Sequence, residues 1–324
     1  MLKYLCKRVA FMLLTLLIIL SICFLLIRLL PNEDVTMFGK DMELVAMNRY
    51  RQGLTDIHGN PIPLIRQYGN FLVRTLLGGN WGTSEKLYYG QDCLQVFVSK
   101  LPATVLVNAY ASLLAVPLGL LLGIYAALKK NRWQDHLIST LVVLFISVPS
   151  YVYAFLVQYF LCYRTGLFPL TAASRQEVAL WSLPMLRSMF PAVLSLAFGT
   201  IAALTRFTRA ELSDAMTGEY MLLARTKGLS RPQLIARHAF KNAMVPILPM
   251  ILGEFVGILG GSLIIEGIFS IPGVGSLYTT AITVRDYNFF MALTFFYTLI
   301  GLASSLMVDI SYALTDPRIQ IGEK

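Results

Sequence analysis

Long uncharged stretches recur along the 324-residue chain and predict helices that cross a membrane. An ionisable side chain at the centre of a bilayer is costly, and about 20 apolar residues span the hydrocarbon. Charged residues therefore mark where each span ends, and Glu254 is the single charge inside a predicted span. We expect six spans: Val9 to Ile27, Leu101 to Leu128, Leu137 to Tyr163, Ser188 to Thr205, Asn242 to Ile265 and Tyr287 to Val308.

The composition agrees with a polytopic all-α membrane protein. Hydrophobic residues make up 56% of the chain and charged residues 14%, with a mean hydropathy of +0.64. Soluble domains have about 25% charged residues, so a soluble protein of this composition would lack the polar side chains to cover its surface. The net charge of +9 then indicates loops retained on the cytoplasmic side, and not a nucleic-acid partner, because no basic domain or tail is present.

The distribution of basic residues predicts the orientation in the membrane. Six spans place both termini on one side. That side holds 15 of the 27 lysine and arginine residues within about 60 residues of chain, and the other 12 are spread over roughly twice that length. The positive-inside rule therefore places both termini in the cytoplasm. The first span is longer than the apolar part of a signal peptide and lacks a small-residue cleavage site, so we expect a retained helix.

This topology divides the chain into four parts. We expect a short tail with the first span (1–30), an extracytoplasmic loop region (31–100), a five-helix core (101–315) with a basic cytoplasmic loop at 206–241, and a cytoplasmic tail (316–324). Turn-forming clusters in the outer region flank an amphipathic helix predicted over Leu64 to Leu77. Cys93, and less clearly Cys162, lies on the oxidising side, which permits a disulfide that nothing else supports.

The basic loop contains helix start and stop signals that a simple connector would not need. Thr217 and Gly218 can begin a helix that runs to Lys227, and Gly228 stands where a left-handed C-cap is expected. Ser230 and Gln233 have the spacing of a capping box with a proline in the first turn, so a second helix begins there and continues towards Met244. Two short helices with a bend suit docking to a partner, and an amphipathic hairpin on anionic lipid is the alternative.

The motifs in this loop and along the chain resemble a known family. The loop motifs are similar to the cytoplasmic "EAA" loop of permease subunits in ABC importers, and the whole set resembles the B-type subunit of the oligopeptide, dipeptide and nickel permease family. The motifs, in chain order, are 79–84 (GNWGTS), 101–104 (LPAT), 147–150 (SVPS), 224–229 (ARTKGL), 237–243 (RHAFKNA) with Pro246, Glu266 with 269–275 (FSIPGVG), 285–287 (RDY), and Asp309 with 314–318 (LTDPR).

The resemblance implies a type I ABC importer permease fold and a role for the loop in docking to a cytoplasmic ATPase. The docking residues it implies are Glu219, Leu222, Ala224, Arg225, Lys227, Gly228, Arg237, His238 and Asn242. The chain departs from the broad pattern at Leu222, where many ABC importers carry a glutamate. Glu219 lies one turn earlier and is a candidate substitute.

No catalytic or metal-binding motif accompanies these features. The chain lacks a phosphate-binding Gly-rich loop, and its three histidines are scattered without a metal spacing. We therefore expect a non-catalytic subunit without a cofactor of its own, with ATP and Mg²⁺ bound by partner ATPase subunits.

Several residues near the membrane are candidates for the transport pathway or a gate. Glu254 is expected to face a water-filled cavity or a subunit interface. Glu266 belongs to the motif that continues into a predicted turn or re-entrant hairpin containing Pro272, Gly273 and Gly275. Asp309 is better explained as a structural anchor. Prolines in or beside spans can kink helices or pack between them; they are Pro117, Pro149, Pro191 and Pro246.

The resulting hypothesis is a permease subunit of a binding-protein-dependent ABC importer in the bacterial inner membrane. It would pair with a second homologous permease, bind two ATPase subunits and receive oligopeptides or dipeptides from an extracytoplasmic binding protein. Nickel, a metallophore, haem or glutathione are alternative substrates. An ion-coupled secondary transporter is the main alternative of another class, although the halves show no repeat and only one ionisable group at depth. A passive scaffold would not need the capped basic loop.

Overall fold

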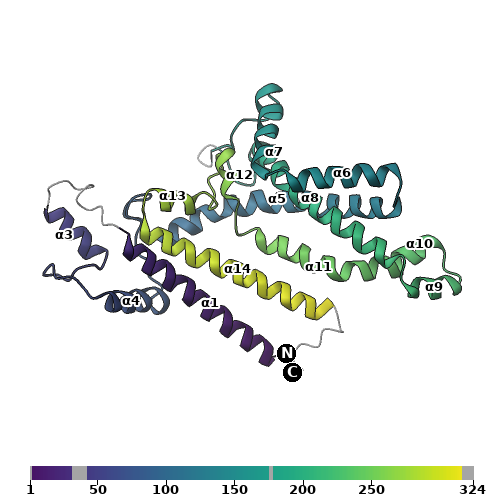
Figure 1. Ribbon diagram of the computed structural model, residues 1–324. Helices are drawn as coiled ribbons and strands as arrows, with labels where there is room; N and C mark the ends of the chain where they lie inside the picture. The colour runs from purple at the N-terminus through teal and green to yellow at the C-terminus, as the bar shows by residue number, and fades with distance from the viewer. Residues whose placement is uncertain (1, 31–41, 175–177, 316–324) are drawn as a thin grey trace. The chain divides into compact units, whose positions relative to one another are not determined.

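The computed structural model describes residues 2–30, 42–174 and 178–315 (Figure 1). Across this part of the chain the secondary structure is helical, and no β-strand forms there. Residue 1, residues 31–41 of the outer region, residues 175–177 and the predicted tail 316–324 lie outside the described residues, as does most of the 314–318 motif.

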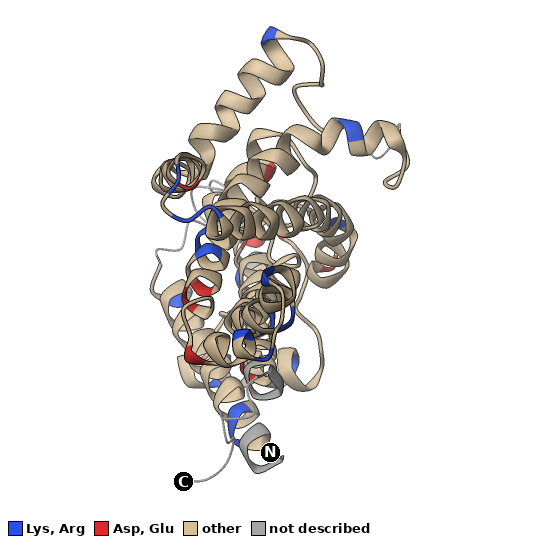
Figure 2. Ribbon diagram, turned by 90° about the vertical axis from the view of Figure 1, so that its right-hand side faces the viewer, with Lys and Arg blue, Asp and Glu red and all other residues tan. Residues whose placement is uncertain are grey.

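Five helices are long and apolar enough to cross a membrane, and a bent pair supplies a sixth candidate. They include α1 (Leu2–Leu29), α5 (Cys93–Leu128), α8 (Leu183–Ala215), α11 (Phe240–Gly257) with the short helices before it, and α14 (Tyr287–Thr315). The predicted all-α membrane fold is therefore confirmed. In Figure 2, where acidic and basic residues are coloured, most of the ribbon is uncharged.

The third predicted span is broken instead of continuous. Helix α6 (Trp133–Ser147) is followed by α7 (Ser150–Val157) and the π-helical η2 (Gln158–Arg164), and the two parts are bent by 103°. Val148, which precedes Pro149, is extended at φ −89° and ψ 129°. A proline disfavours the helical conformation of the residue before it, so the Val148–Pro149 step ends α6. The kink that Pro149 was expected to permit is thus a full break in the helix.

Helix α8 runs through Arg206 to Ala215, so it continues into the first ten residues of the predicted 206–241 loop. One other predicted limit needs correction. Helix α11 ends at Gly257 and not at Ile265, and a turn at 258–262 leads into α12 (Leu263–Ile268). Pro117, Pro191 and Pro246 lie inside α5, α8 and α11, which continue through them.

The chain divides into two compact units. The first comprises Met1–Arg8, Phe97–Thr279 and Tyr297–Lys324, and the second comprises Val9–Val96 and Thr280–Phe296. In the first unit, α8 packs against α6, α7 and α11. Its main hydrophobic cluster joins residues of α5, α7, α8 and α12, including Val107, Ala154, Met189 and Ile265. Helix α13 (Leu277–Thr283) follows α12 in the chain.

Small residues allow α5 and α8 to approach closely. A Cβ atom on Gly119 would lie 2.7 Å from Leu204 Cβ, and one on Gly123 would lie 2.5 Å from Thr208 Cβ. The Thr205 hydroxyl donates a 3.2 Å hydrogen bond to the carbonyl of Gly119. Glycines four residues apart commonly form such contacts between membrane helices, so α5 and α8 form a tightly packed pair.

The second unit contains α3 (Met42–Arg51), α4 (Leu64–Leu72) and η1 (Val73–Leu77), packed beside most of α1. The amphipathic helix predicted over Leu64 to Leu77 is confirmed as the continuous pair α4 and η1. Phe24 of α1 stacks on Phe71 of α4 with ring centroids 5.1 Å apart. All four cysteines lie in the described part of the chain and are free, and Cys93 and Cys162 are both buried.

Candidate functional site

The basic loop contains the two predicted helices. Helix α9 spans Glu219–Thr226, with Gly218 as its N-cap and Lys227 as its C-cap. Gly228 then has a φ of +80°, a left-handed conformation that L side chains adopt at a cost. The helix predicted from Thr217 and Gly218 to Lys227, and the stop at Gly228, are therefore confirmed.

The second helix of the loop is continuous with a membrane span. Helix α10 (Arg231–Leu234) begins with the predicted capping box, in which the Ser230 backbone N–H donates to Gln233 Oε1 at 3.1 Å. It continues through the π-helical η3 (Ile235–Ala239) into α11. The stretch Arg231–Gly257 is long and apolar enough to cross a membrane, so the loop and a candidate span share one helical segment.

One face of α9 anchors the loop to the helix ends around it. Met221 and Ala224 are buried in a cluster with Leu212 of α8 and Leu234 of α10. The same cluster includes Ala127 at the end of α5 and two residues of the α10–α11 stretch, Ala239 and Ala243. Helix α9 therefore shares buried contacts with α5, α8 and the α10–α11 stretch.

The opposite face of α9 is an uncovered apolar surface. Leu222 is 63% exposed and Leu223 is 61% exposed. Glu219 is also exposed and lies three residues before Leu222, so the two side chains are neighbours on the helix surface. Among the other predicted docking residues, Arg225, Lys227, Arg237 and Asn242 are exposed, His238 is partly buried and Ala224 faces inward. Figure 2 views the structure from the side on which α9 and α10 lie.

The predicted gate residues form a buried polar cluster. Glu266 of α12 has no exposed surface, and its carboxylate accepts three hydrogen bonds. The donors are the Thr104 hydroxyl at 2.9 Å, the Gly275 N–H at 2.8 Å and the Ser262 N–H at 3.3 Å. Thr104 Oγ1 in turn accepts the Val274 N–H at 2.8 Å. Three donors replace the water that a buried carboxylate loses.

Neighbouring atoms lie so close to Gly273 and Gly275 that a larger residue would not fit at either position. A Cβ on Gly273 would overlap both Thr104 Oγ1 and Glu266 Oε2, and one on Gly275 would lie 2.8 Å from the Ser262 carbonyl oxygen. Pro272 lies between the buried Ile271 and Gly273 and is itself partly buried. The predicted turn at 271–275 is therefore confirmed as a turn fixed against Glu266 and Thr104.

Glu254 has different partners from Glu266. It lies in α11, is partly buried and accepts a hydrogen bond from the Thr200 hydroxyl of α8 at 3.3 Å. The two glutamates predicted as pathway candidates therefore belong to separate polar contacts. Near the other end of the first unit, Arg8 and Asp309 form an ion pair with a 2.9 Å separation, in agreement with an anchoring role for Asp309.

Two buried aspartates were not among the predicted site residues. Asp135 is 1% exposed and pairs through both oxygens with the Arg209 guanidinium, with a 2.8 Å distance from Nη2 to Oδ2. Asp286, which has no exposed surface, accepts the Ser84 hydroxyl at 2.5 Å and the Lys86 and Leu87 N–H groups at 3.0 Å each. In the sequence, each of these aspartates is a charged residue beside a predicted span, and this position could have marked it as a candidate.

Comparison with known proteins decides the family. A family model described as "binding-protein-dependent transport system inner membrane component" matches residues 119–321, which is more than half of the chain. The chain belongs to this family. It is therefore a permease component of a binding-protein-dependent importer. The matched region contains α9, α10, Glu266 and the 271–275 turn, whereas Thr104 lies before it.

Relatives match the permease along nearly its whole length. It is 32% identical over 321 residues to a dipeptide transport system permease protein of Lactococcus lactis, covering 99% of this chain and 100% of that protein. It is also 32% identical to a dipeptide transport system permease protein of Bacillus subtilis, covering all of both chains. A glutathione transport system permease protein of Salmonella typhimurium is 30% identical, with 99% of each chain covered.

A solved structure supports the fold of the permease. A chain from the crystal structure of an amino acid ABC transporter with histidines aligns with a TM-score of 0.51 and 18% identity. The alignment covers 68% of the permease and 94% of that chain. The predicted ABC permease fold is therefore confirmed.

Proposed function

We propose that the permease is a non-catalytic subunit that forms a translocation pathway with a second homologous permease and receives its driving force through α9. The observation that carries this proposal is the two-faced character of α9. Met221 and Ala224 fix one face to the ends of α5, α8 and the α10–α11 stretch, while Leu222 and Leu223 leave the other face open. A partner that grips the open face moves the anchored helices.

The local structure of the loop suits this role. The left-handed turn at Gly228 and the capping box at Ser230 define a short connection between α9 and α10. Because α10 continues into α11, a movement that crosses this connection is passed from α10 to a span along one helical stretch. The partner is a pair of cytoplasmic ATPase subunits that bind ATP and Mg²⁺, and the permease needs no cofactor of its own.

The topology follows from the same proposal. Both termini and the loop lie in the cytoplasm, in accord with the distribution of lysine and arginine. The bent α6–α7 pair is counted as one span, so six spans return the chain to its starting side. The protein resides in the bacterial inner membrane, and the region between α1 and α5 faces an extracytoplasmic binding protein.

The substrate class we propose is short peptides. The dipeptide permeases of Lactococcus lactis and Bacillus subtilis support this choice. Glutathione is the second candidate because the Salmonella typhimurium glutathione permease is almost as similar. Nickel, a metallophore and haem are further alternatives. Ligand binding by the binding protein encoded beside the permease distinguishes all of them.

We divide the predicted pathway residues into two roles. Glu254 is the candidate for contact with the pathway or the partner permease, because it is partly buried and accepts a single hydrogen bond, from Thr200. Glu266, Gly273 and Gly275, with Pro272 beside them, hold the 271–275 turn in place as a fixed part of a gate.

Purification from native membranes tests this function. The proposal predicts that ATPase subunits copurify with the permease and that their ATP hydrolysis rises when a loaded binding protein is added. Transport by the lone chain that follows a proton gradient would instead support a secondary transporter.

The missing glutamate of the loop has its own test. We propose that Glu219 replaces the acidic side chain that the family pattern places at Leu222, since the two positions are neighbours on the exposed face of α9. Glu219→Ala should weaken assembly with the ATPase, whereas the nearby exposed change Thr226→Ala serves as a control. Unchanged assembly and coupling in Glu219→Ala would rule the replacement out.

A further inference from the structure

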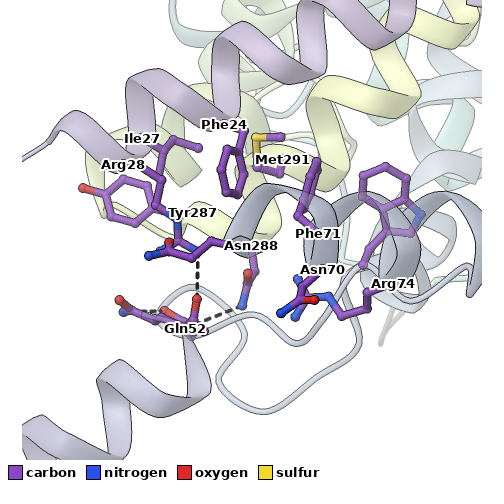
Figure 3. Close-up of a pocket in the computed structure, with 14 residues that line it drawn as sticks. Phe24, Ile27, Arg28, Gln52, Asn70, Phe71, Arg74, Tyr287, Asn288 and Met291 are labelled. Carbon is purple, nitrogen blue, oxygen red and sulfur yellow. Dashed lines mark hydrogen bonds between the residues drawn. The ribbon is translucent and has the colours of Figure 1, made fainter. Parts of the chain in front are cut away.

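A polar pocket lies in the second unit, at the ends of two membrane spans. Its volume is about 110 Å³ (Figure 3). Arg28 lines it from the last turn of α1, and Tyr287 lines it from the first position of α14. Both helices are candidate spans, ending at Leu29 and beginning at Tyr287. The pocket is therefore at the level where a bilayer changes from hydrocarbon to headgroups.

The lining is divided into apolar and polar sides. Figure 3 shows Phe24, Ile27 and Met291 on one side and the amide or guanidinium groups of Gln52, Asn70 and Arg74 on the other. Beyond the pocket, α1 continues as exposed apolar surface, with Leu26 57% exposed and Leu29 77% exposed. A ligand with a polar head and an apolar tail matches both parts.

The charges in the pocket favour an anion. Two guanidinium groups, those of Arg28 and Arg74, line it together with one carboxylate, that of Glu85. Both Glu85 oxygens are already engaged, because Gln52 Nε2 donates to one at 3.2 Å and Asn288 Nδ2 donates to the other at 3.0 Å. Burial also raises the pKa of Glu85 above its ordinary value. The positive charges are therefore incompletely balanced.

Two buried polar atoms of the lining residues lack partners among the residues that the structure describes. They are Arg28 Nε, a donor, and Gln67 Oε1, an acceptor. Arg28 is otherwise well held, since its Nη2 donates to the Gln52 carbonyl at 2.8 Å and its Cζ lies 5.2 Å from the centre of the Phe24 ring. Both atoms belong to side chains that line the pocket, and they have almost no accessible surface. A ligand that offers an anion and a hydroxyl or ammonium group would supply the missing partners once these side chains turn towards it.

We propose that this pocket binds the headgroup of an anionic phospholipid, with the phosphate held by Arg28 and Arg74. The glycerol hydroxyls of phosphatidylglycerol supply a donor for Gln67 Oε1, and the acyl chains lie along the apolar surface of α1. The pocket has room for the phosphate alone, because a cavity of about 150 Å³ holds the six heavy atoms of a benzene ring and this one has about 110 Å³. The glycerol of the headgroup would lie at the mouth of the pocket. Basic pockets between membrane helices bind lipid headgroups in this manner.

The bound lipid would join the outer region to the membrane. Arg74 belongs to η1 in the region between α1 and α5, whereas Arg28 belongs to a span. A phosphate between them links the two elements through charge-assisted hydrogen bonds. This site does not depend on the ATPase or the transported substrate, so its test is independent of the proposed function.

Native mass spectrometry of the purified full chain tests the proposal. The protein is extracted with its copurifying subunits and equilibrated with an equal mixture of phosphatidylglycerol and phosphatidylcholine. We expect wild type to retain phosphatidylglycerol selectively. Arg74→Gln should lower its apparent affinity about tenfold or more, the range expected for a lost hydrogen bond to a charged group, and Arg74→Lys should keep part of it. Arg74 is exposed at the surface, so these variants should fold.

Two controls decide the interpretation. Arg66→Gln removes an exposed arginine from α4 that does not line the pocket, and it should leave the lipid preference unchanged. Inorganic phosphate at millimolar concentration should not displace the lipid. Equal retention of phosphatidylglycerol by wild type and Arg74→Gln, or complete displacement by inorganic phosphate, would overturn the proposal.

Discussion

The Thr104 hydroxyl donates a 2.9 Å hydrogen bond to Glu266 Oε1 and so joins α5 to α12 across 162 residues of sequence. The same hydroxyl oxygen accepts the Val274 N–H, which fixes the 271–275 turn to both helices. One threonine therefore supplies a donor to a buried carboxylate and an acceptor to a buried backbone amide.

Replacing Thr104 with valine should destabilise the permease. The isosteric change leaves Glu266 with one donor fewer and leaves the Val274 N–H unpaired, and an unsatisfied buried group costs about 1–3 kcal/mol. Thermal unfolding in detergent measures the effect, and Thr104→Ser, which keeps the hydroxyl, should retain most of the stability. Equal melting temperatures for wild type and Thr104→Val would show that these hydrogen bonds contribute little.

A glycine of the 271–275 turn and one of α12 give a matched pair of variants. A methyl group on Gly273 would overlap Thr104 Oγ1 and Glu266 Oε2, whereas one on Gly267 would meet no atom within 4 Å. Gly273→Ala should cost about 1–3 kcal/mol through overpacking, and Gly267→Ala, within α12, should be neutral or slightly stabilising. Similar losses of stability in the two variants would contradict the close packing of this turn.

The contact between α5 and α8 should also be disrupted by a larger side chain. Gly123→Leu would drive a side chain into Thr208 and the Thr205 carbonyl oxygen, which a Cβ alone would approach to 2.9 Å. We expect a marked loss of folded protein in size-exclusion chromatography. Gly301→Ala in α14 is the control, because its Cβ would meet nothing within 4 Å. Wild-type yield and stability for Gly123→Leu would mean that the two helices do not pack as described.

A double-mutant cycle tests the Asp135–Arg209 pair. Asp135 is almost fully buried, whereas the Arg209 side chain is 32% exposed, so solvent screens part of the interaction. Arg209→Gln alone should destabilise by about 1–3 kcal/mol because it leaves a buried carboxylate with fewer donors. Asp135→Asn should recover part of that loss when added to Arg209→Gln. Strict additivity of the two changes would show that the pair is not coupled.

Local signals in the sequence predicted the helices of the basic loop well. Gly218, Gly228 and the Ser230–Gln233 capping box act within a few residues of their own position, so α9 and the start of α10 could be located without tertiary information. The six apolar stretches were found for a similar reason. Charged side chains are costly inside a membrane, so the positions of the charged residues in the sequence indicate where spans can lie.

Charge marks the end of a predicted span but not the end of a helix. Arg206 follows a predicted span, and α8 continues past Arg209, whose charge is paired with Asp135. The break at Val148 was also underestimated, although Pro149 restricts the residue before it. The spacing of Gly119 and Gly123 was a readable packing signal that the charge pattern does not include.

The polar clusters could not be assembled from the sequence. Glu266 was a candidate, but its partner Thr104 is distant in the chain, and nothing in either local sequence specifies the other. Asp286 and Ser84 are separated by 202 residues and present the same difficulty. Such pairs depend on how helices pack, which one sequence without homologues does not reveal.

The central claim is that the exposed face of α9 receives the ATPase. The direct measurement is the amount of ATPase subunit that copurifies with tagged Leu223→Asp, which places a charge on this face while Met221 and Ala224 remain buried. Ile57→Asp, at a position 74% exposed in the outer region, is the control. We predict that Leu223→Asp loses the ATPase and binding-protein-stimulated hydrolysis while Ile57→Asp retains both. If Leu223→Asp retained the ATPase and its stimulation in full, the exposed face of α9 would not be the surface that binds the ATPase.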